Sequence, residues 1–147
     1  GAADRRRNWG AQRFAALATA MLQRDHAIVL IGGPDEAQLA KEIVSAIPAA
    51  ARDRVMTVAQ ASILVSAATL RHCDACVGND TGALNMAAAN AVPSIGLFGV
   101  SPPLRHDPIL RAVTGAGMDA IAVDAVIAAL AGSGFPLEPA HGNPGSA

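Results

Sequence analysis

The sequence predicts an α/β fold with a parallel, Rossmann-like sheet that carries helices on both faces. Its strand candidates are continuous apolar runs, such as residues 27–31 and 74–77, rather than alternating apolar and polar residues. Stretches with apolar residues at helical spacing separate these runs. Continuous apolar strands that alternate with helices are typical of parallel sheets buried on both faces. The length of 147 residues suits one domain with a sizeable core.

The first half of the chain contains two helix candidates and two strand candidates. A helix starts near Trp9, and the apolar strand at residues 27–31 follows it. The sequence Gly-Gly-Pro at 32–34 breaks this strand, and its proline suits the first turn of a second helix. A second strand is predicted at residues 55–58. The helix residues expected to face the core are Phe14, Leu17, Ala18, Met21, Leu22, Leu39, Ile43 and Ile47.

The second half continues the alternation. Apolar residues repeat at helical spacing over 63–70, which predicts a third helix. The apolar run that follows predicts a central strand from Asp74 to Gly78, and capping residues predict a helix that begins at Thr81. Another strand is predicted at residues 93–99, where a glycine ends the run.

The last segments are less regular. Residues 120–123 form either a short strand or an extended lead-in to a helix over 124–130. Beyond this helix the composition becomes rich in glycine, serine and proline, so we predict one domain over residues 1–131 and a flexible tail over 132–147. Because a doubly wound unit starts with a strand and the first element here is a helix, we expect the preceding strand to belong to a longer protein.

Composition and charge exclude several classes of function. The chain has 11 basic and 12 acidic residues, so nucleic acid and anionic membranes are not expected as partners. The basic cluster at residues 5–7 is short and suits a solvated face. No apolar run is long enough for a transmembrane segment and no export leader is recognised, so we expect a cytoplasmic protein, with peripheral membrane attachment left open.

Cys73 and Cys76 form a Cys-x-x-Cys motif directly after His72. A structural zinc site takes about four ligands, no second Cys/His pair follows at a suitable distance, and His106 and His141 are isolated. Since free cysteine is also among the most buried residue types, we expect reduced, metal-free thiols.

Common nucleotide and hydrolase motifs are missing from the sequence. It contains no Gly-x-Gly-x-x-Gly after the first strand, no Walker loop and no Gly-x-Ser-x-Gly elbow. These absences argue against a dehydrogenase, a P-loop ATPase and a serine hydrolase.

Polar or glycine-rich turns follow four of the predicted strands. They lie at residues 32–36, 58–60, 78–82 and 99–103. Ligands of parallel sheets bind at the carboxyl ends of the strands, so we expect one crevice there. Glu36 can accept hydrogen bonds from ribose hydroxyls, and the helix start at Thr81 can face a diphosphate. The alternative, in which the turn at 78–82 is only a helix cap, remains open.

Five blocks of residues, taken in order, resemble the C-terminal half of the bacterial heptosyltransferases, glycosyltransferase family 9. These blocks are Arg7-Asn8-Trp9 with residues 13–17, residues 30–36, Gly78-Asn79-Asp80-Thr81-Gly82, residues 92–99, and residues 121–126. The resemblance covers nearly everything from residue 7 to residue 130. It implies one half of a GT-B glycosyltransferase, namely its C-terminal nucleotide-sugar-binding domain.

The resemblance also implies a set of donor-binding residues, which are Arg7, Glu36, Asp80, Thr81, Gly82, Ala83 and Asn85. The donor would be ADP-heptose, and the acceptor of the full-length enzyme would be the lipopolysaccharide core. The sequence departs from the family at Arg7, where a lysine is usual, and at Asn85, where a histidine is usual. Asparagine can hydrogen-bond a phosphate or a hydroxyl but cannot carry a positive charge.

The resemblance implies transfer of a glycosyl group with no cofactor and no metal, and departure of a nucleoside diphosphate. The general base would belong to the N-terminal domain, so we expect this chain alone to bind a donor without catalysing transfer. Two alternatives remain open: a GT-B domain for another donor, such as a UDP- or CMP-linked sugar, and a non-catalytic nucleotide-binding module.

Overall fold

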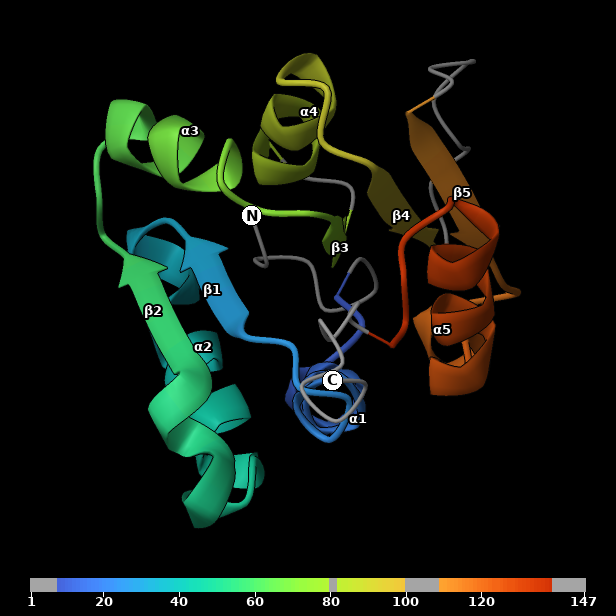
Figure 1. Ribbon diagram of the computed structural model, residues 1–147, viewed down its shortest axis with the longest axis horizontal. Coiled ribbons are helices and arrows are strands. Elements are labelled where there is room, and N and C mark those ends of the chain that lie inside the picture. The colour runs from blue at the N-terminus through green and yellow to red at the C-terminus, as the bar shows by residue number, and fades with distance from the viewer. Residues whose placement is uncertain (1–7, 80–81, 100–108, 139–147) are drawn as a thin grey trace, which may run out of the picture.

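The computed structural model describes residues 8–79, 82–99 and 109–138. Five strands occur along these residues, and an α-helix separates each strand from the next as far as β4 (Figure 1). The strands are β1 (Ile28–Gly32), β2 (Val55–Ala59), β3 (Cys76–Asn79), β4 (Ser94–Phe98) and β5 (Leu110–Thr114). The α-helices are α1 (Ala11–Leu22), α2 (Ala37–Ala46), α3 (Ile63–Leu70), α4 (Gly82–Ala89) and α5 (Val123–Gly132), and the short 3-10 helices are η2 (Pro34–Glu36), η3 (Ala49–Arg54) and η4 (Met118–Ala120).

The strands form two parallel sheets rather than the single sheet that the sequence predicts. β1 pairs with β2, and β4 pairs with both β3 and β5. The prediction that Asp74 to Gly78 is a central strand is wrong in one respect, because β3 lies at the edge of its sheet and β4 is central. All five residues of β4 are buried, as expected for the strand with neighbours on both sides.

Most of the other predicted elements are confirmed. The predicted helix near Trp9, the strands at 27–31, 55–58 and 93–99 and the helix over 63–70 all occur, with ends that shift by one or two residues. Residues 121–122 are an extended lead-in to α5 rather than a strand. The sequence did not predict η3 or β5. In β5, Arg111, Ala112 and Thr114 are exposed.

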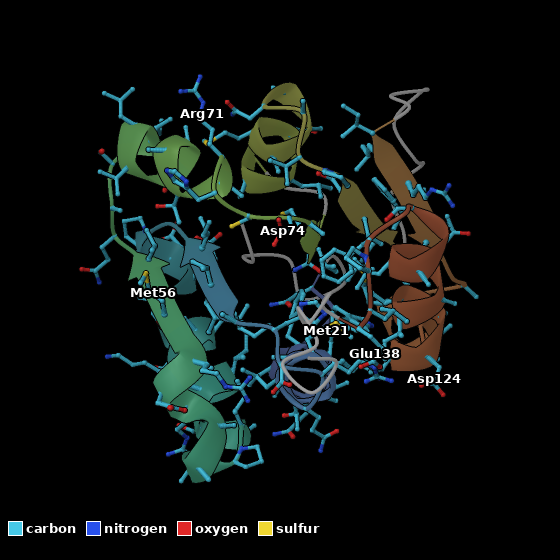
Figure 2. All side chains as sticks on the ribbon, in the orientation of Figure 1. Met21, Met56, Arg71, Asp74, Asp124 and Glu138 are labelled. Atoms are coloured by element: carbon cyan, nitrogen blue, oxygen red, sulfur yellow. The ribbon has the colours of Figure 1, made fainter. Side chains whose placement is uncertain are left out.

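Helix α1 is shared by two apolar clusters. Leu17 and Met21 pack with β4 and α5, and Met21 is marked in Figure 2. Ala18 and Leu22, on another side of α1, pack with Ile43 and its neighbours on α2. The hydrophobic positions of α1 therefore contact the cores of both sheets.

A third cluster lies under α3 and α4. Leu70, Ala87 and Val92 are its buried members, and Ile31 of β1 and Cys76 of β3 pack against them. Because these two strands belong to different sheets, α3 and α4 contact both sheets as α1 does.

The residues that follow α5 return to α1. Phe135 and Leu137 pack against the cluster formed by α1, β4 and α5. His26 Nε2 lies 2.6 Å from the carbonyl oxygen of Leu137, and Arg24 forms an ion pair of 3.5 Å with Glu138. Glu138 is labelled in Figure 2. The predicted tail therefore has contacts as far as Glu138, and residues 139–147 lie outside the described part of the chain.

Candidate functional site at the carboxyl ends of the strands

The parallel pairing places the carboxyl ends of the strands at one edge of each sheet. β1 ends at Gly32, β2 at Ala59, β3 at Asn79 and β4 at Phe98. The turn after β2 contains Gln60, whose φ of 64° is in the left-handed region that residues with a side chain rarely adopt. These ends carry the turns in which the sequence predicts a ligand site.

Asn79 connects this edge to the start of α1. Its Oδ1 accepts a hydrogen bond of 3.1 Å from the backbone N–H of Trp9, and its Nδ2 donates one of 3.3 Å to Oδ1 of Asn8. Asn79 is one of the few buried polar residues. The residues next to it in sequence are Gly78 and Asp80, and those next to Asn8 are Arg7 and Trp9, so two predicted donor-site segments meet here.

Trp9 is fixed from several sides. Its indole Nε1–H donates to the carbonyl oxygen of Ile121 over 2.9 Å, and its ring meets Phe14 edge to face with the centroids 5.1 Å apart. Arg13 donates to the carbonyl oxygen of Trp9 over 2.9 Å and lies 3.3 Å from the carboxylate of Asp119. The tryptophan is fully buried, so the segment that leads into α1 has a single defined position.

Helix α4 begins at this edge, directly after the two residues that follow β3. Gly82 is exposed, and a methyl group placed on it would meet no described atom within 4 Å. Leu84 is buried, whereas Asn85 is exposed in the first turn. The first N–H groups of a helix have no partner within it, so this open helix start suits an anion.

The carboxylate of Glu36 already has a partner in its own turn. Its Oε2 accepts a hydrogen bond of 2.7 Å from the backbone N–H of Gly33. This bond holds the 3-10 turn that follows β1, where Pro34 is the first residue of η2. Glu36 is half-buried, and its other carboxylate oxygen is not used by this bond.

Gly96, in the middle of β4, and Gly99, directly after it, serve packing. A methyl group on Gly96 would lie 2.6 Å from the ring of Phe98, and one on Gly99 would lie 2.4 Å from the backbone nitrogen of Met118. A side chain at either position would force its neighbours to shift, so the two glycines differ from the open position at Gly82.

The thiols of Cys73 and Cys76 are both free. Burial raises the pKa of Cys76 to about 11, with a further contribution from Cys73. Burial and the neighbouring Asp74 also raise the pKa of Cys73. Both thiols are therefore neutral at physiological pH, which disfavours a nucleophilic role. Within residues 8–79, 82–99 and 109–138, no three His, Cys, Asp or Glu side chains are grouped so that they could hold a metal ion.

The structure describes part of the predicted site. Gly82, Ala83 and Asn85 lie in the first turn of α4, and Glu36 lies at the carboxyl end of β1. Arg7, Asp80 and Thr81 lie outside the described residues, so their placement stays a prediction.

Sequence reasoning did not assign roles to Asn8, Trp9 and Asn79. The available signals were an asparagine that ends an apolar run and the only tryptophan of the chain. Neither signal identifies the partner, because the contact joins residues 70 positions apart.

Comparison with known proteins begins with the sequence. Residues 1–123 match the family model of glycosyltransferase family 9 (heptosyltransferase). Lipooligosaccharide heptosyltransferase 2 of Haemophilus influenzae is 30% identical over 104 residues, which cover 70% of this chain and 30% of that protein. Lipopolysaccharide heptosyltransferase 2 of Salmonella typhimurium and that of Escherichia coli are each 30% identical over 121 residues, or 74% of this chain and 33% of theirs. The chain thus spans about a third of the length of these relatives.

Solved structures share the fold. The E. coli ADP-heptose lps heptosyltransferase II superposes with a TM-score of 0.78 at 23% identity, over 87% of this chain and 42% of that chain. E. coli heptosyltransferase WaaC with ADP superposes with a TM-score of 0.77 at 17% identity, over 90% of this chain and 42% of that chain. The fold agrees with the family match over residues 1–123, and the chain belongs to glycosyltransferase family 9, the heptosyltransferases.

Proposed function

We propose that this chain is the donor-binding domain of a glycosyltransferase that moves heptose from ADP-heptose to the lipopolysaccharide inner core. Membership in the heptosyltransferase family supports the reaction class. The relatives are named as lipopolysaccharide or lipooligosaccharide heptosyltransferases, and one similar structure is of WaaC with ADP-2-deoxy-2-fluoro heptose. The lipopolysaccharide acceptor is proposed as a substrate of the full-length protein, not of this chain alone.

One observation carries the proposal for this chain: the Asn79 side chain joins the segment after Arg7 to the segment before Asp80. A cation and a helix N-terminus near each other form a site for a diphosphate. In this proposal Arg7 and the N–H groups of Thr81, Gly82 and Ala83 stabilise the negative charge of the departing ADP.

The remaining predicted residues have supporting roles. Asn85 would hydrogen-bond the phosphate or the sugar from the first turn of α4, where its side chain is exposed. Glu36 would accept hydrogen bonds from the ribose through the oxygen that Gly33 does not use. Asp80 would contact the donor sugar or the diphosphate.

Acceptor activation is assigned to another part of the full-length enzyme. Deprotonation of an acceptor hydroxyl needs a general base, which the family resemblance places in the N-terminal domain. The isolated chain is therefore expected to bind ADP weakly, since half of the cleft is missing and the ligand stays partly solvated, and to show no transfer.

Titration calorimetry with ADP, UDP and CMP tests the donor assignment. ADP should bind best, and replacement of Asp80 or Thr81 by Ala should weaken its binding by about 1 to 2 kcal/mol. If UDP binds best, the ADP-heptose assignment is wrong, and the chain is instead a GT-B domain for another nucleotide-sugar donor. If no nucleotide binds at millimolar concentration, the donor site is refuted for this chain.

A matched pair of glutamates tests the ribose contact. Glu36→Gln should weaken ADP binding, because an amide oxygen is a poorer acceptor than a carboxylate, while its oxygen can still accept the Gly33 N–H. Glu42→Gln is the control, because Glu42 is exposed on α2 and contacts Gln38 of the same helix. Equal affinities for the two variants would exclude Glu36 from the donor site.

An activity assay on the full-length protein distinguishes a heptosyltransferase from a non-catalytic nucleotide-binding module. A non-catalytic nucleotide-binding module would bind ADP but release no ADP from ADP-heptose in the presence of lipopolysaccharide acceptor. A heptosyltransferase releases it with acceptor and shows little release without acceptor.

A further inference from the structure

Among the helices of the described residues, only α3 exposes large apolar side chains. The exposed large apolar residues are Met56 of β2 and three consecutive residues at the start of α3, namely Ile63, Leu64 and Val65. The exposed fractions of the three are 75%, 81% and 50%. A helix that is apolar on all sides is normally covered on all sides, so the outer side of α3 suits a further contact.

The exposed side of α3 forms a stripe along the helix. Leu64, Ala68 and Arg71 follow one another at spacings of four and three residues, which places them on one face, and all three are exposed. On the opposite side Ser66 and Leu70 are buried, and Leu70 belongs to the cluster under α3 and α4. The stripe is therefore apolar up to the arginine that follows the helix, which is labelled in Figure 2.

The first turn of α3 has part of its backbone hydrogen bonding satisfied. Ser62 Oγ accepts the N–H of Val65 over 3.2 Å, and the carbonyl oxygen of Ser62 accepts the N–H of Ser66 over 3.0 Å. The helix itself contains no charged residue. Unpaired polar groups enter lipid at a high cost in free energy, so this capped apolar start is suited to partial insertion into lipid.

The size of the stripe favours a lipid surface over a protein partner. A stable interface between two proteins takes about 20 to 30 residues on each side, many more than this stripe offers. An interfacial helix, by contrast, inserts only one apolar face by about 5 to 10 Å. With eight residues α3 is about 12 Å long, so it would lie along a bilayer. Within residues 8–79, 82–99 and 109–138, no helix is long and apolar enough to cross a membrane.

The local charge around α3 suits anionic lipid. The overall balance of 11 basic and 12 acidic residues, from which anionic membranes are not expected, averages over the whole chain. From residue 54 to residue 73 there is no Asp or Glu, and the exposed Arg71 and His72 follow α3 directly. Arg71 Nε donates to Oδ1 of Asn90 over 3.2 Å, which holds the guanidinium at this end of the helix. Cations at such a position attract anionic head groups.

Helix α3 also lies close to the candidate donor site. Because β1 and β2 are parallel, α3, which begins after the turn at 60–62, starts at the edge that carries the turn of Glu36. Leu70 of α3 and Ala87 of α4 share one cluster, so the two helices lie side by side (Figure 1). In the proposed function the acceptor is lipopolysaccharide, a sugar chain carried on a lipid. A bilayer contact beside the site would bring the enzyme to such an acceptor.

We propose, resting on the proposed function, that the outer side of α3 docks on a bilayer surface that contains anionic lipid. Ile63, Leu64 and Val65 insert among the lipids, and Arg71 stays at the level of the head groups. The edge that carries Glu36 then faces the region next to the membrane.

Flotation of the full-length protein with vesicles tests this docking. The vesicles consist of phosphatidylethanolamine and phosphatidylglycerol without lipopolysaccharide, so binding does not depend on the acceptor. Leu64→Glu should weaken vesicle binding about tenfold, because a buried apolar side chain is replaced by a charge. Glutamate in the first turn suits a helix, so α3 should stay folded. Absence of vesicle binding by the wild type would overturn the proposal.

Met56→Glu is the matched control. Met56 is 60% exposed but lies on β2, where Figure 2 labels it, so this variant should bind vesicles within about twofold of the wild type. Equal losses in Met56→Glu and Leu64→Glu, or no loss in either, would overturn the assignment to α3.

Arg71→Gln tests the orientation of the stripe. It should weaken binding about fivefold on vesicles with phosphatidylglycerol and leave binding to pure phosphatidylcholine unchanged, because one cation near anionic lipid is lost. An equal effect on both kinds of vesicle would mean that Arg71 does not face the head groups, which contradicts the proposal.

Measurements without vesicles distinguish the other occupants. If the wild type is a dimer in sedimentation velocity and Leu64→Glu is a monomer, a second copy covers the stripe. If Leu64→Glu lowers the Tm of the full-length protein, another part of the same protein covers it. Either result overturns the proposal. Titration with ADP tests the proposed function separately: vesicle binding that depends on Leu64, in a protein that binds no ADP, supports the docking surface and refutes the donor site.

Discussion

The side-chain oxygen of Asn79 accepts the backbone N–H of Trp9 over 3.1 Å and so ties the end of β3 to the residue that precedes α1 by two positions. The same side chain donates to Asn8. Both bonds lie at the edge where the strands end, so the asparagine organises this edge without being one of the predicted donor ligands.

Replacing Asn79 by Ala is expected to lower the free energy of unfolding by about 1 to 3 kcal/mol, because the buried N–H of Trp9 then lacks its acceptor. Urea denaturation measures this change. Asn85→Ala is the control: its side chain is exposed, so stability should change by less than about 0.5 kcal/mol while ADP binding weakens. A large stability loss in the control would show that Asn85 has a structural role.

Gly82 and Gly99 are expected to respond in opposite ways to alanine. Gly82→Ala has open space and adds a better helix former, so stability should hold or rise while ADP binding weakens by about 1 kcal/mol or more. Gly99→Ala forces a methyl group against the backbone of Met118 and should cost about 1 to 3 kcal/mol of stability. Thermal unfolding with and without ADP measures both effects. Unchanged ADP affinity in Gly82→Ala would place the ligand elsewhere.

The free energy of unfolding should fall as the pH rises from about 9 to about 11. Burial raises the pKa of Cys76 from 9.0 to about 11, so the unfolded chain loses this proton at a lower pH than the folded one. The stabilisation is complete below pH 9, and about 2 kcal/mol of it should be lost by pH 10.5. The sequence has no tyrosine to titrate in this range.

Denaturant midpoints at pH 8 and pH 10.5 measure this loss. Cys76→Ala should reduce it strongly, whereas Cys73→Ala should reduce it less, because Cys73 contributes only secondarily to the shift of Cys76. An unchanged slope in Cys76→Ala would mean that other groups cause the pH dependence.

Ala91 offers a site for stabilisation. It follows α4 with a φ of 60°, while the next residue, Val92, donates its N–H to the carbonyl oxygen of Ala87 over 3.0 Å. Glycine is the favoured residue at this left-handed position, so Ala91→Gly should raise the free energy of unfolding by about 0.5 to 1 kcal/mol. Ala89→Gly, two positions earlier at the last residue of α4, should lower it by about 0.5 kcal/mol. The same sign for both variants would contradict the explanation from backbone conformation.

The local pattern of the sequence predicts most elements, because buried strands and helices leave apolar runs of distinct period. Residues 94–98 form a buried strand where the apolar run predicts one, and the strand at Cys76–Asn79 begins two residues later than predicted. The strand at Leu110–Thr114 escapes prediction because only one face of this outer edge strand is covered, so its sequence includes Arg111 and Thr114. The central or edge position of β3 depends on pairing between distant segments, which local patterns do not encode.

For the candidate site, too, local sequence predicts some features, whereas others depend on tertiary contacts. Turn composition predicts that Glu36 and Gly82 follow strands, and both do: Glu36 ends the 3-10 turn after β1, and Gly82 begins the helix after β3. The hydrogen bond of Glu36 to Gly33 and the contact of Asn79 with Trp9 depend on tertiary geometry, so the sequence does not reveal them. The roles of Arg7, Asp80 and Thr81 come from family resemblance and stay predictions.

The position of Trp9 makes the molecule its own optical probe. It is the only tryptophan and there is no tyrosine, so near-ultraviolet emission originates from one buried indole that donates to Ile121 at the candidate site. A shift of that emission to longer wavelength reports water reaching this single point. Opening of this edge of the protein can therefore be followed in real time without a dye or a label.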